Sequence, residues 1–188
     1  MKKVLIAIGI IVGIIVILVG TFISSYNGLV SMNEEVDGKL ADISVQLERR
    51  ADLIPNLVST VKGYASHEKE VIDSITSARD SLVNAETIEE KAEANEELTS
   101  ALNKLLVIVE NYPDLKANSN FVQLQDELAG TENRIAVARN NYNDAVKEYN
   151  KAVKSFPKNI LANMFGFDEK EYFEAKESSN EVPEVSFE

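Results

Sequence analysis

The stretch FVQLQDELAGTENRIAVARNNYNDAVKEYNKAVKSF, residues 121–156, carries apolar or aromatic side chains at alternating steps of three and four residues. That spacing places the side chains in one stripe along a helix, whereas a strand would show alternation at steps of two. The stripe positions, of which only Thr131 is polar, are Phe121, Leu124, Leu128, Thr131, Ile135, Ala138, Tyr142, Ala145, Tyr149, Ala152 and Phe156. We predict a long amphipathic helix that begins near Asn118, Ser119 and Asn120, with Asn120 and Gln123 resembling a capping box, and stops at Pro157.

The same spacing extends over the rest of the chain beyond its first 24 residues. One stripe comprises Val36, Leu40, Ile43, Leu47, Arg50, Ile54, Leu57, Val61 and Tyr64, and continues in phase to Ala85. Another helix is expected from about Ile88 to Asn111, and a short one in NILANMFGF after Pro157. No segment is typical of a strand. The sequence therefore predicts an all-α protein in which an antiparallel, up-and-down four-helix bundle is built from long, kinked helices.

Pro55 interrupts the first of these patterns and leaves two alternatives. In one, Asp52 caps a new helix whose first turn tolerates Pro55. In the other, the helix continues with a bend, and packing compensates for the lost backbone hydrogen bond. We favour the bend because the stripe keeps its phase across Pro55, and we expect a second bend near Gly63, so that the stretch behaves as two helices.

The amino-terminal segment has a different composition. Twenty residues from Val4 to Ile23 contain no charged group, which is enough to cross the hydrocarbon layer of a bilayer as a helix. A secretory signal peptide is the alternative, but the apolar run is long for one and TFISSY offers no convincing cleavage site. Gly9 and Gly13 form a GxxxG pair, which can bring two membrane helices together but also arises readily by chance.

The charge pattern predicts the orientation of the chain in a membrane. Lys2 and Lys3 precede the apolar segment, and basic residues near a span are retained on the cytoplasmic side. We therefore predict a single-pass protein of the cell membrane with a cytoplasmic amino terminus and an extracytoplasmic bundle. The rest of the chain carries 17 of the 19 basic residues against 31 acidic ones, which argues against nucleic acid as a partner. The complete absence of cysteine excludes disulfides and thiolate chemistry.

The expected organisation has three parts: a membrane anchor over residues 1–24, a helical bundle domain over residues 25–175, and an acidic disordered tail over residues 176–188. The tail is predicted from its polar, acidic and proline-containing sequence.

Arg50 occupies a stripe position, where an unpaired guanidinium would cost several kcal/mol, so it should reach water or meet a carboxylate. We group it with other polar residues near the same stripes as a candidate binding site, the polar belt. Its members are Arg49, Arg50, Asp52, Asn56, His67, Arg134, Arg139 and Tyr142. Salt bridges that fix helix register are one interpretation, and a site for an anionic ligand or partner is the other.

Catalytic constellations are not evident in the sequence. His67 is the only histidine, and Val71 stands where HExxH would need the second one. The glycines outside the apolar segment are isolated, so no phosphate-binding loop is predicted, and 31 acidic residues make any chosen carboxylate pair uninformative. We predict no catalytic residue, no metal site and no cofactor.

Several blocks carry a family likeness. They are SYNGLV at 25–30, VQLERRADLIPNLVSTVKGYASHE at 45–68, SARD at 77–80, NYPDLKANSNFVQLQDELAGTENRIAVARNNYNDAVKEYN at 111–150 and FPKNILANMFGFDEKEYFEA at 156–175. In this order after one apolar segment, they closely resemble the bacterial LemA family, apart from Ala51 where a tyrosine is common and Leu40 where a tryptophan is frequent. The resemblance implies a membrane-anchored helical bundle to which no enzymatic reaction is generally assigned, with related members linked to membrane organelle biogenesis and often encoded near membrane metalloproteases.

These observations lead to one main hypothesis and two alternatives. The main hypothesis is a non-enzymatic envelope protein that binds another envelope protein, or itself, near the membrane. The first alternative is an enzyme or small-ligand-binding domain with a polar pocket around Arg49, Asp52, His67 and Arg134. The second is direct remodelling of the membrane by oligomers.

Overall fold

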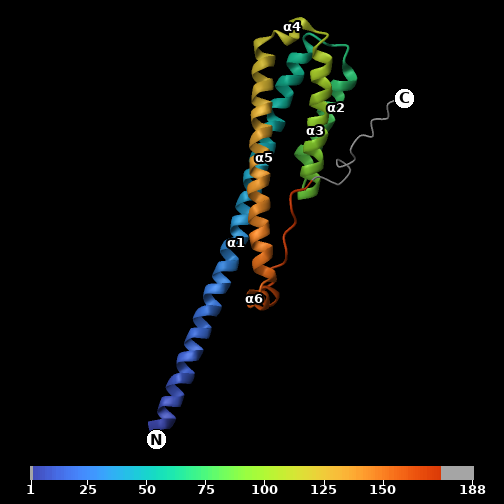
Figure 1. Cartoon of the computed structure of the whole chain (residues 1–188). Coiled ribbons are helices and arrows are strands. Elements are labelled where there is room, and N and C mark those ends of the chain that lie inside the picture. The colour runs from blue at the N-terminus through green and yellow to red at the C-terminus, as the bar shows by residue number, and fades with distance from the viewer. Residues whose placement is uncertain (1, 175–188) are drawn as a thin grey trace, which may run out of the picture. The chain divides into compact units, whose positions relative to one another are not determined.

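The computed structural model describes residues 2–174 and is helical, with no strand in that range, which confirms that the protein is all-α (Figure 1). The predicted tail, residues 176–188, lies outside the described residues. The helices are α1 (Lys2–Lys62), α2 (Lys69–Asn84), α3 (Ile88–Val109), α4 (Pro113–Lys116), α5 (Ser119–Lys154) and α6 (Lys158–Phe165).

Helix α1 runs without interruption across Pro55, so the alternative in which a new helix starts after Asp52 is wrong. The favoured alternative, in which the helix continues across Pro55, is confirmed, and the stretch divides into two helices after Lys62, near Gly63 as expected. Pro55 is exposed, whereas Ile54 and Leu57 beside it are each 1% exposed. The free energy gained by burying these two side chains offsets the loss of the backbone hydrogen bond that the proline cannot make.

The amino-terminal part of α1 is apolar and uncovered. Every side chain from residue 8 to residue 24 is exposed, and the window of highest hydropathy has none of its residues buried. Among the described residues, α1 alone is long and apolar enough to cross a membrane, by length and composition.

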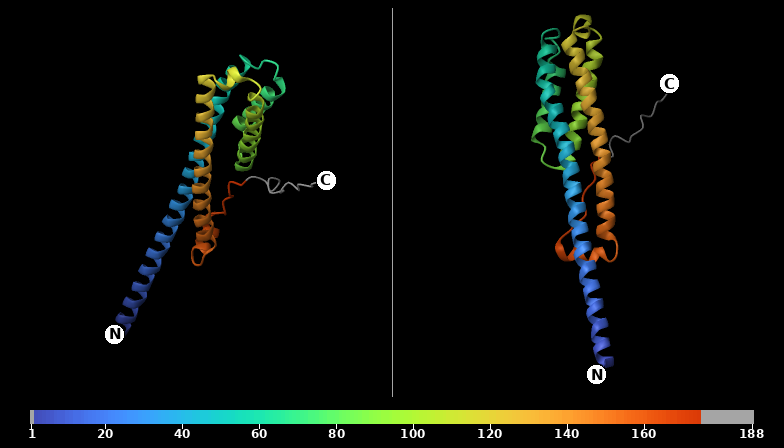
Figure 2. Two further views of the ribbon diagram at one scale, coloured as in Figure 1. Left: turned by 45° about the horizontal axis from the view of Figure 1, so that its top comes forward. Right: turned by 90° about the vertical axis from the view of Figure 1, so that its left-hand side faces the viewer.

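The described chain divides into two compact units that share α1 and α5. The first unit comprises residues 2–39 and 142–171, and the second comprises residues 40–141 and 172–174. In the first unit, the part of α1 that follows the apolar segment runs beside the end of α5, and α6 lies against them (Figure 2). Its buried apolar side chains are Leu29, Val36, Tyr142, Val146, Tyr149, Ala152, Val153, Leu161 and Ala162.

The second unit holds the larger set of buried side chains. Helices α2 and α3 pack against each other as a hairpin, as both figures show (Figure 2). The predicted stripes supply the interior, which includes Ile43, Leu47, Ile54, Leu57, Val61, Val71, Ile75, Ala78, Leu82, Leu98, Leu105, Phe121, Leu128 and Ile135. Tyr64 departs from its stripe: it lies after the end of α1, is 45% exposed, and its hydroxyl accepts a hydrogen bond from Asn118.

Helix boundaries follow local chemistry. At the start of α3, Thr87 Oγ1 accepts from the Glu90 amide at 3.1 Å, and Glu90 Oε2 accepts from the Thr87 amide at 3.0 Å, forming a capping box. At the start of α5, Asn118 Oδ1 accepts from the Phe121 amide at 3.0 Å, so the cap is Asn118 instead of the expected Asn120.

The ends of α3 and α5 also differ slightly from the expectation. Helix α3 stops at Val109, and the unexpected short helix α4 follows, with Pro113 at its first position. Helix α5 stops at Lys154, so Phe156 falls outside it and is 80% exposed instead of continuing the stripe. The short helix expected after Pro157 is confirmed as α6.

Candidate functional site

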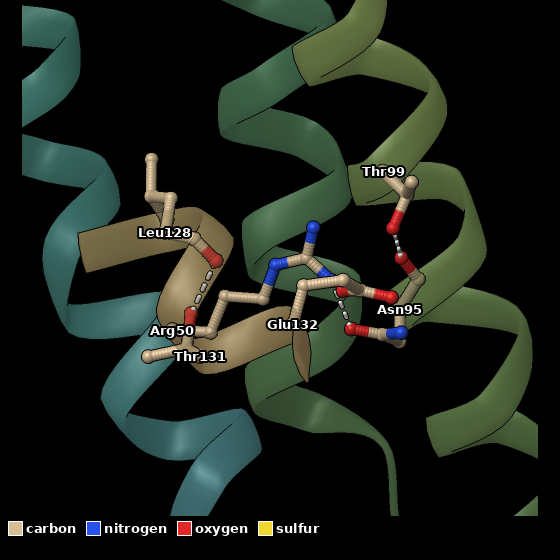
Figure 3. Close-up of polar contacts among 6 residues, drawn as sticks. All are labelled: Arg50, Asn95, Thr99, Leu128, Thr131 and Glu132. Atoms are coloured by element: carbon tan, nitrogen blue, oxygen red, sulfur yellow. Dashed lines mark hydrogen bonds and ion pairs between the residues drawn. The ribbon is translucent and has the colours of Figure 1, made fainter. Parts of the chain in front are cut away.

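The centre of the candidate site is Arg50, on the part of α1 that belongs to the second unit. Its stripe position points it inward, and it is only 3% exposed. Nη1 of Arg50 donates to Oδ1 of Asn95 on α3 at 2.6 Å and also to Oε2 of Glu132 on α5 (Figure 3). One guanidinium nitrogen thus joins three helices.

The surrounding polar groups are fixed by their own helices. Asn95 is 3% exposed, and its backbone carbonyl accepts a hydrogen bond from Thr99 Oγ1 at 2.9 Å. Thr131, the polar residue of the α5 stripe, is fully buried and donates from Oγ1 to the Leu128 carbonyl at 2.8 Å (Figure 3). Thr131 therefore satisfies its hydroxyl within α5 and leaves Glu132 as the residue of α5 that meets Arg50.

Burial lowers the pKa of the Arg50 guanidinium, and the carboxylate of Glu132 opposes this effect. The Glu132 side chain is 40% exposed, so part of its charge is still solvated. The Arg50 guanidinium is not saturated: Nε is buried and has no hydrogen-bond partner among the described residues. Figure 3 shows Nη2 directed away from the Asn95 amide and the Glu132 carboxylate. The group can accept a further hydrogen-bonding partner.

A pocket of about 410 Å³ adjoins this cluster, with Arg50 and Glu132 in its wall. Most of the remaining wall is apolar and comes from α1, α3 and α5. The other lining residues are Leu57, Thr99, Leu102, Asn103, Leu105, Leu106, Phe121, Gln125, Asp126, Leu128 and Ala129. Its volume lies in the usual range for binding pockets, and its composition suits an apolar group with one polar end.

The remaining members of the polar belt do not gather at this pocket. Arg49, Asp52, Asn56, His67 and Arg134 are all exposed, and none of them lines it. Asn56 instead lines a separate, more open groove with residues of α5. The sequence-based pocket around four of these residues is therefore not the pocket that contains Arg50.

Arg139 and Tyr142 have partners elsewhere. Cζ of Arg139 lies 5.5 Å from the centre of the Phe173 ring, within cation–π distance. In the first unit, the Tyr142 hydroxyl donates to the Glu171 carbonyl at 2.8 Å. Both contacts hold the segment that follows α6 in place.

Asn95 and Glu132 are site residues that the sequence analysis missed. Asn95 could have been found, because it interrupts the apolar stripe of α3 between Ala92 and Leu98. A polar residue in such a position needs a hydrogen-bond partner, and Arg50 is a charged residue in an inward-facing position of another stripe. Glu132 gave no comparable signal, because it stands beside the stripe among many other acidic residues.

Metal binding has no support in the described part of the chain, where no group of three or more histidine, cysteine, aspartate or glutamate residues could hold a metal ion.

Comparison with known proteins places the chain in a family. Residues 39–187 match the model of the LemA family, which is most of the sequence. The chain belongs to the LemA family. The match covers the helices that contribute Arg50, Asn95 and Glu132, so the pocket lies within the LemA region. The match begins at residue 39, so the apolar segment lies outside it.

Three curated proteins are similar to this LemA-family chain. Magnetosome protein MamQ 2 and magnetosome protein MamQ 1 of Paramagnetospirillum magneticum are each 27% identical to it, over 86% of this chain and 69% of the relative. Magnetosome protein MamQ of Magnetospirillum gryphiswaldense is 26% identical over the same shares.

Proposed function

We propose that this protein is a membrane-anchored, non-enzymatic interaction module of the cell envelope. α1 is the anchor, and the second unit binds an apolar side chain of a partner protein or of a second copy. The observation that carries the proposal is the bare apolar part of α1, where every side chain from residue 8 to residue 24 is exposed. Such a surface needs a nonaqueous environment, and a bilayer provides it.

The arrangement of the second unit is part of this proposal. We take the segment 40–62 of α1, α2, α3 and the segment 119–141 of α5 as an antiparallel, up-and-down four-helix bundle. The short connections between these helices, of which only residues 110–118 contain a further helix, and the common set of buried stripes support it. The two basic residues before the span favour a cytoplasmic amino terminus and an extracytoplasmic bundle.

The pocket beside Arg50 is the proposed docking point. Leu106 lines it and is 43% exposed, so an apolar partner side chain can reach the leucine-rich wall from outside. Arg50 and Glu132 form an ion pair with each other. This pairing supports a structural role for the two residues and not a catalytic one. The three relatives are described as magnetosome proteins, which supports a role in a cellular assembly for this chain too.

A direct test is site-specific photocrosslinking in native membranes. We expect a photoreactive side chain at Leu106 to give a discrete crosslinked band, and Leu106→Glu to prevent binding of that captured partner. Val83, 53% exposed on α2, is the matched control, and Val83→Glu should leave binding unchanged. No crosslink at Leu106, or equal effects of both substitutions, would contradict the proposed docking point.

A second candidate function is the binding of a small molecule in the same pocket. The unpartnered Nε of Arg50 favours it, because a guanidinium with a free donor can bind a carboxylate or a carbonyl oxygen. A ligand retained through purification and identified by mass spectrometry would support this candidate. Its loss in Leu106→Trp, where the larger ring fills the pocket, would locate it.

A further inference from the structure

Helix α6 and the residues beside it expose a second apolar surface, in the first unit. Phe156 is 80% exposed, Ile160 53%, Met164 64% and Phe165 48%. Ile160 and Met164 are four residues apart and therefore share one face of α6. The opposite face is already used, because Leu161 and Ala162 are buried. The surface formed by Phe156, Ile160, Met164 and the exposed part of Phe165, whose ring also packs against α1, is here called the α6 face.

An aromatic cluster holds the α6 face beside α1, at the end of the apolar segment of that helix. Phe165 lies 4.9 Å from Tyr26 and 6.1 Å from Phe22, measured between ring centres, and Phe167 lies 5.8 Å from Tyr26. Phe22 is inside the predicted span and Tyr26 is just beyond its end. α6 is therefore held at the level where the chain would leave the hydrocarbon layer, beside α1 (Figure 2).

The turn after α6 maintains this placement. Gly166 adopts a left-handed conformation, with φ of 73°, which a side chain would disfavour. The Phe167 amide then donates to the Ala162 carbonyl at 3.0 Å and closes the end of the helix. Asn150 of α5 pairs with the backbone of Lys170 by two hydrogen bonds of 2.9 Å each. The α6 face is thus a fixed feature of the first unit.

We propose that α6 is a second membrane contact, in which the α6 face lies in the interfacial region of the same bilayer that α1 spans. This rests on the proposed anchoring role of α1. Aromatic rings concentrate at the headgroup level, and short apolar helix faces bind where headgroups meet acyl chains. The cluster of Phe22, Tyr26, Phe165 and Phe167 joins the α6 face to the span, so one lipid surface covers both.

The absence of tryptophan in the sequence allows a direct test. The full chain carrying Met164→Trp is reconstituted into phosphatidylcholine vesicles, with and without lipids brominated near the headgroup end of the acyl chain. We expect blue-shifted emission that the brominated lipids quench by at least about half. Val107→Trp is the matched control, because Val107 is 72% exposed on α3 in the second unit, and its emission should stay that of a solvated indole.

A third variant separates this inference from the anchoring proposal. Ile15→Trp reports on the span and should be quenched by lipids brominated deep in the acyl chain. Quenching at position 15 together with solvated, unquenched emission at position 164 would overturn the α6 contact alone. No quenching at position 15 would overturn the anchor itself. Blue-shifted emission at position 164 that lipid does not quench would mean that protein covers the α6 face, and would also overturn the proposal.

Discussion

Nη1 of Arg50 on α1 donates a hydrogen bond of 2.6 Å to Oδ1 of Asn95 on α3, and both side chains are 3% exposed. Because this bond can form at only one relative position of the two helices, we expect it to select their register as well as to contribute energy. The same nitrogen also donates to Oε2 of Glu132, which lies on α5.

Replacing Arg50 with alanine should reduce the free energy of unfolding by about 3 kcal/mol, because the change leaves Asn95 buried without its donor and opens a cavity. Urea unfolding of the full chain in detergent micelles, followed by circular dichroism, measures this. Arg49→Ala, at an exposed neighbouring position, should change stability by less than about 0.5 kcal/mol. Equal effects of the two substitutions would show that the buried cluster is not a stabilising contact.

Pro55→Ala should stabilise the protein by about 1–3 kcal/mol. Alanine supplies the backbone donor that Pro55 lacks in the interior of α1 and removes the clash with the carbonyl of Ala51. The urea midpoint should rise while its slope stays constant. Ser59→Ala on the same helix, a change of intrinsic propensity alone, should give a smaller gain of about 0.5 kcal/mol. A lower midpoint for Pro55→Ala would mean that packing depends on the proline.

The Tyr142 hydroxyl should lose its proton at a higher pH than an ordinary tyrosine. Burial raises its pKa from 10.0 to about 12, with smaller contributions from Asp37 and Glu171. Since the folded state holds the phenolic proton more tightly than the unfolded state, this stabilisation is present below pH 10.0 and is lost as the pH rises towards about 12. Ultraviolet titration of tyrosinate should show ionisation near pH 12 whose amplitude Tyr142→Phe reduces. An unchanged titration curve in that variant would refute the assignment.

Asn150→Ala should release the segment after α6. The substitution removes both hydrogen bonds to the Lys170 backbone, so hydrogen exchange of the Lys170 amide should accelerate about 10-fold or more, corresponding to about 1.4 kcal/mol. Lys147→Ala, at an exposed position of α5, should leave that exchange rate unchanged. If both variants exchanged alike, the Asn150 pair would not be what holds the segment.

The helical class was predictable because apolar spacing alone specifies inward-facing positions. Ile43, Leu57, Phe121 and Ile135 are buried where their stripes put them. Helix ends were less accessible, since they depend on which side chain reaches a free amide first. Asn118 and Asn120 are chemically equal as caps, and only the backbone geometry selects Asn118.

The candidate site was predictable only in part. Arg50 was found because a charged group in an apolar stripe needs a partner, but the identity of that partner depends on how α3 and α5 are set against α1. Tyr142 was grouped with Arg50 by its stripe, although its hydroxyl bonds a carbonyl of the returning segment. Stripe spacing says which way a side chain points and leaves open what it meets.

Helix α1 has no break between its bare apolar residues and the buried Leu29 and Val36 of the first unit. Each residue of a helix adds a rotation of about 100°. Inserting one residue between Ile23 and Leu29 would therefore rotate the bare apolar segment by more than a quarter turn relative to the packed side of α1. The helix is continuous at this point, so if the apolar segment spans a bilayer as proposed, a tilt or rotation of that segment passes directly to the packed helices of the first unit.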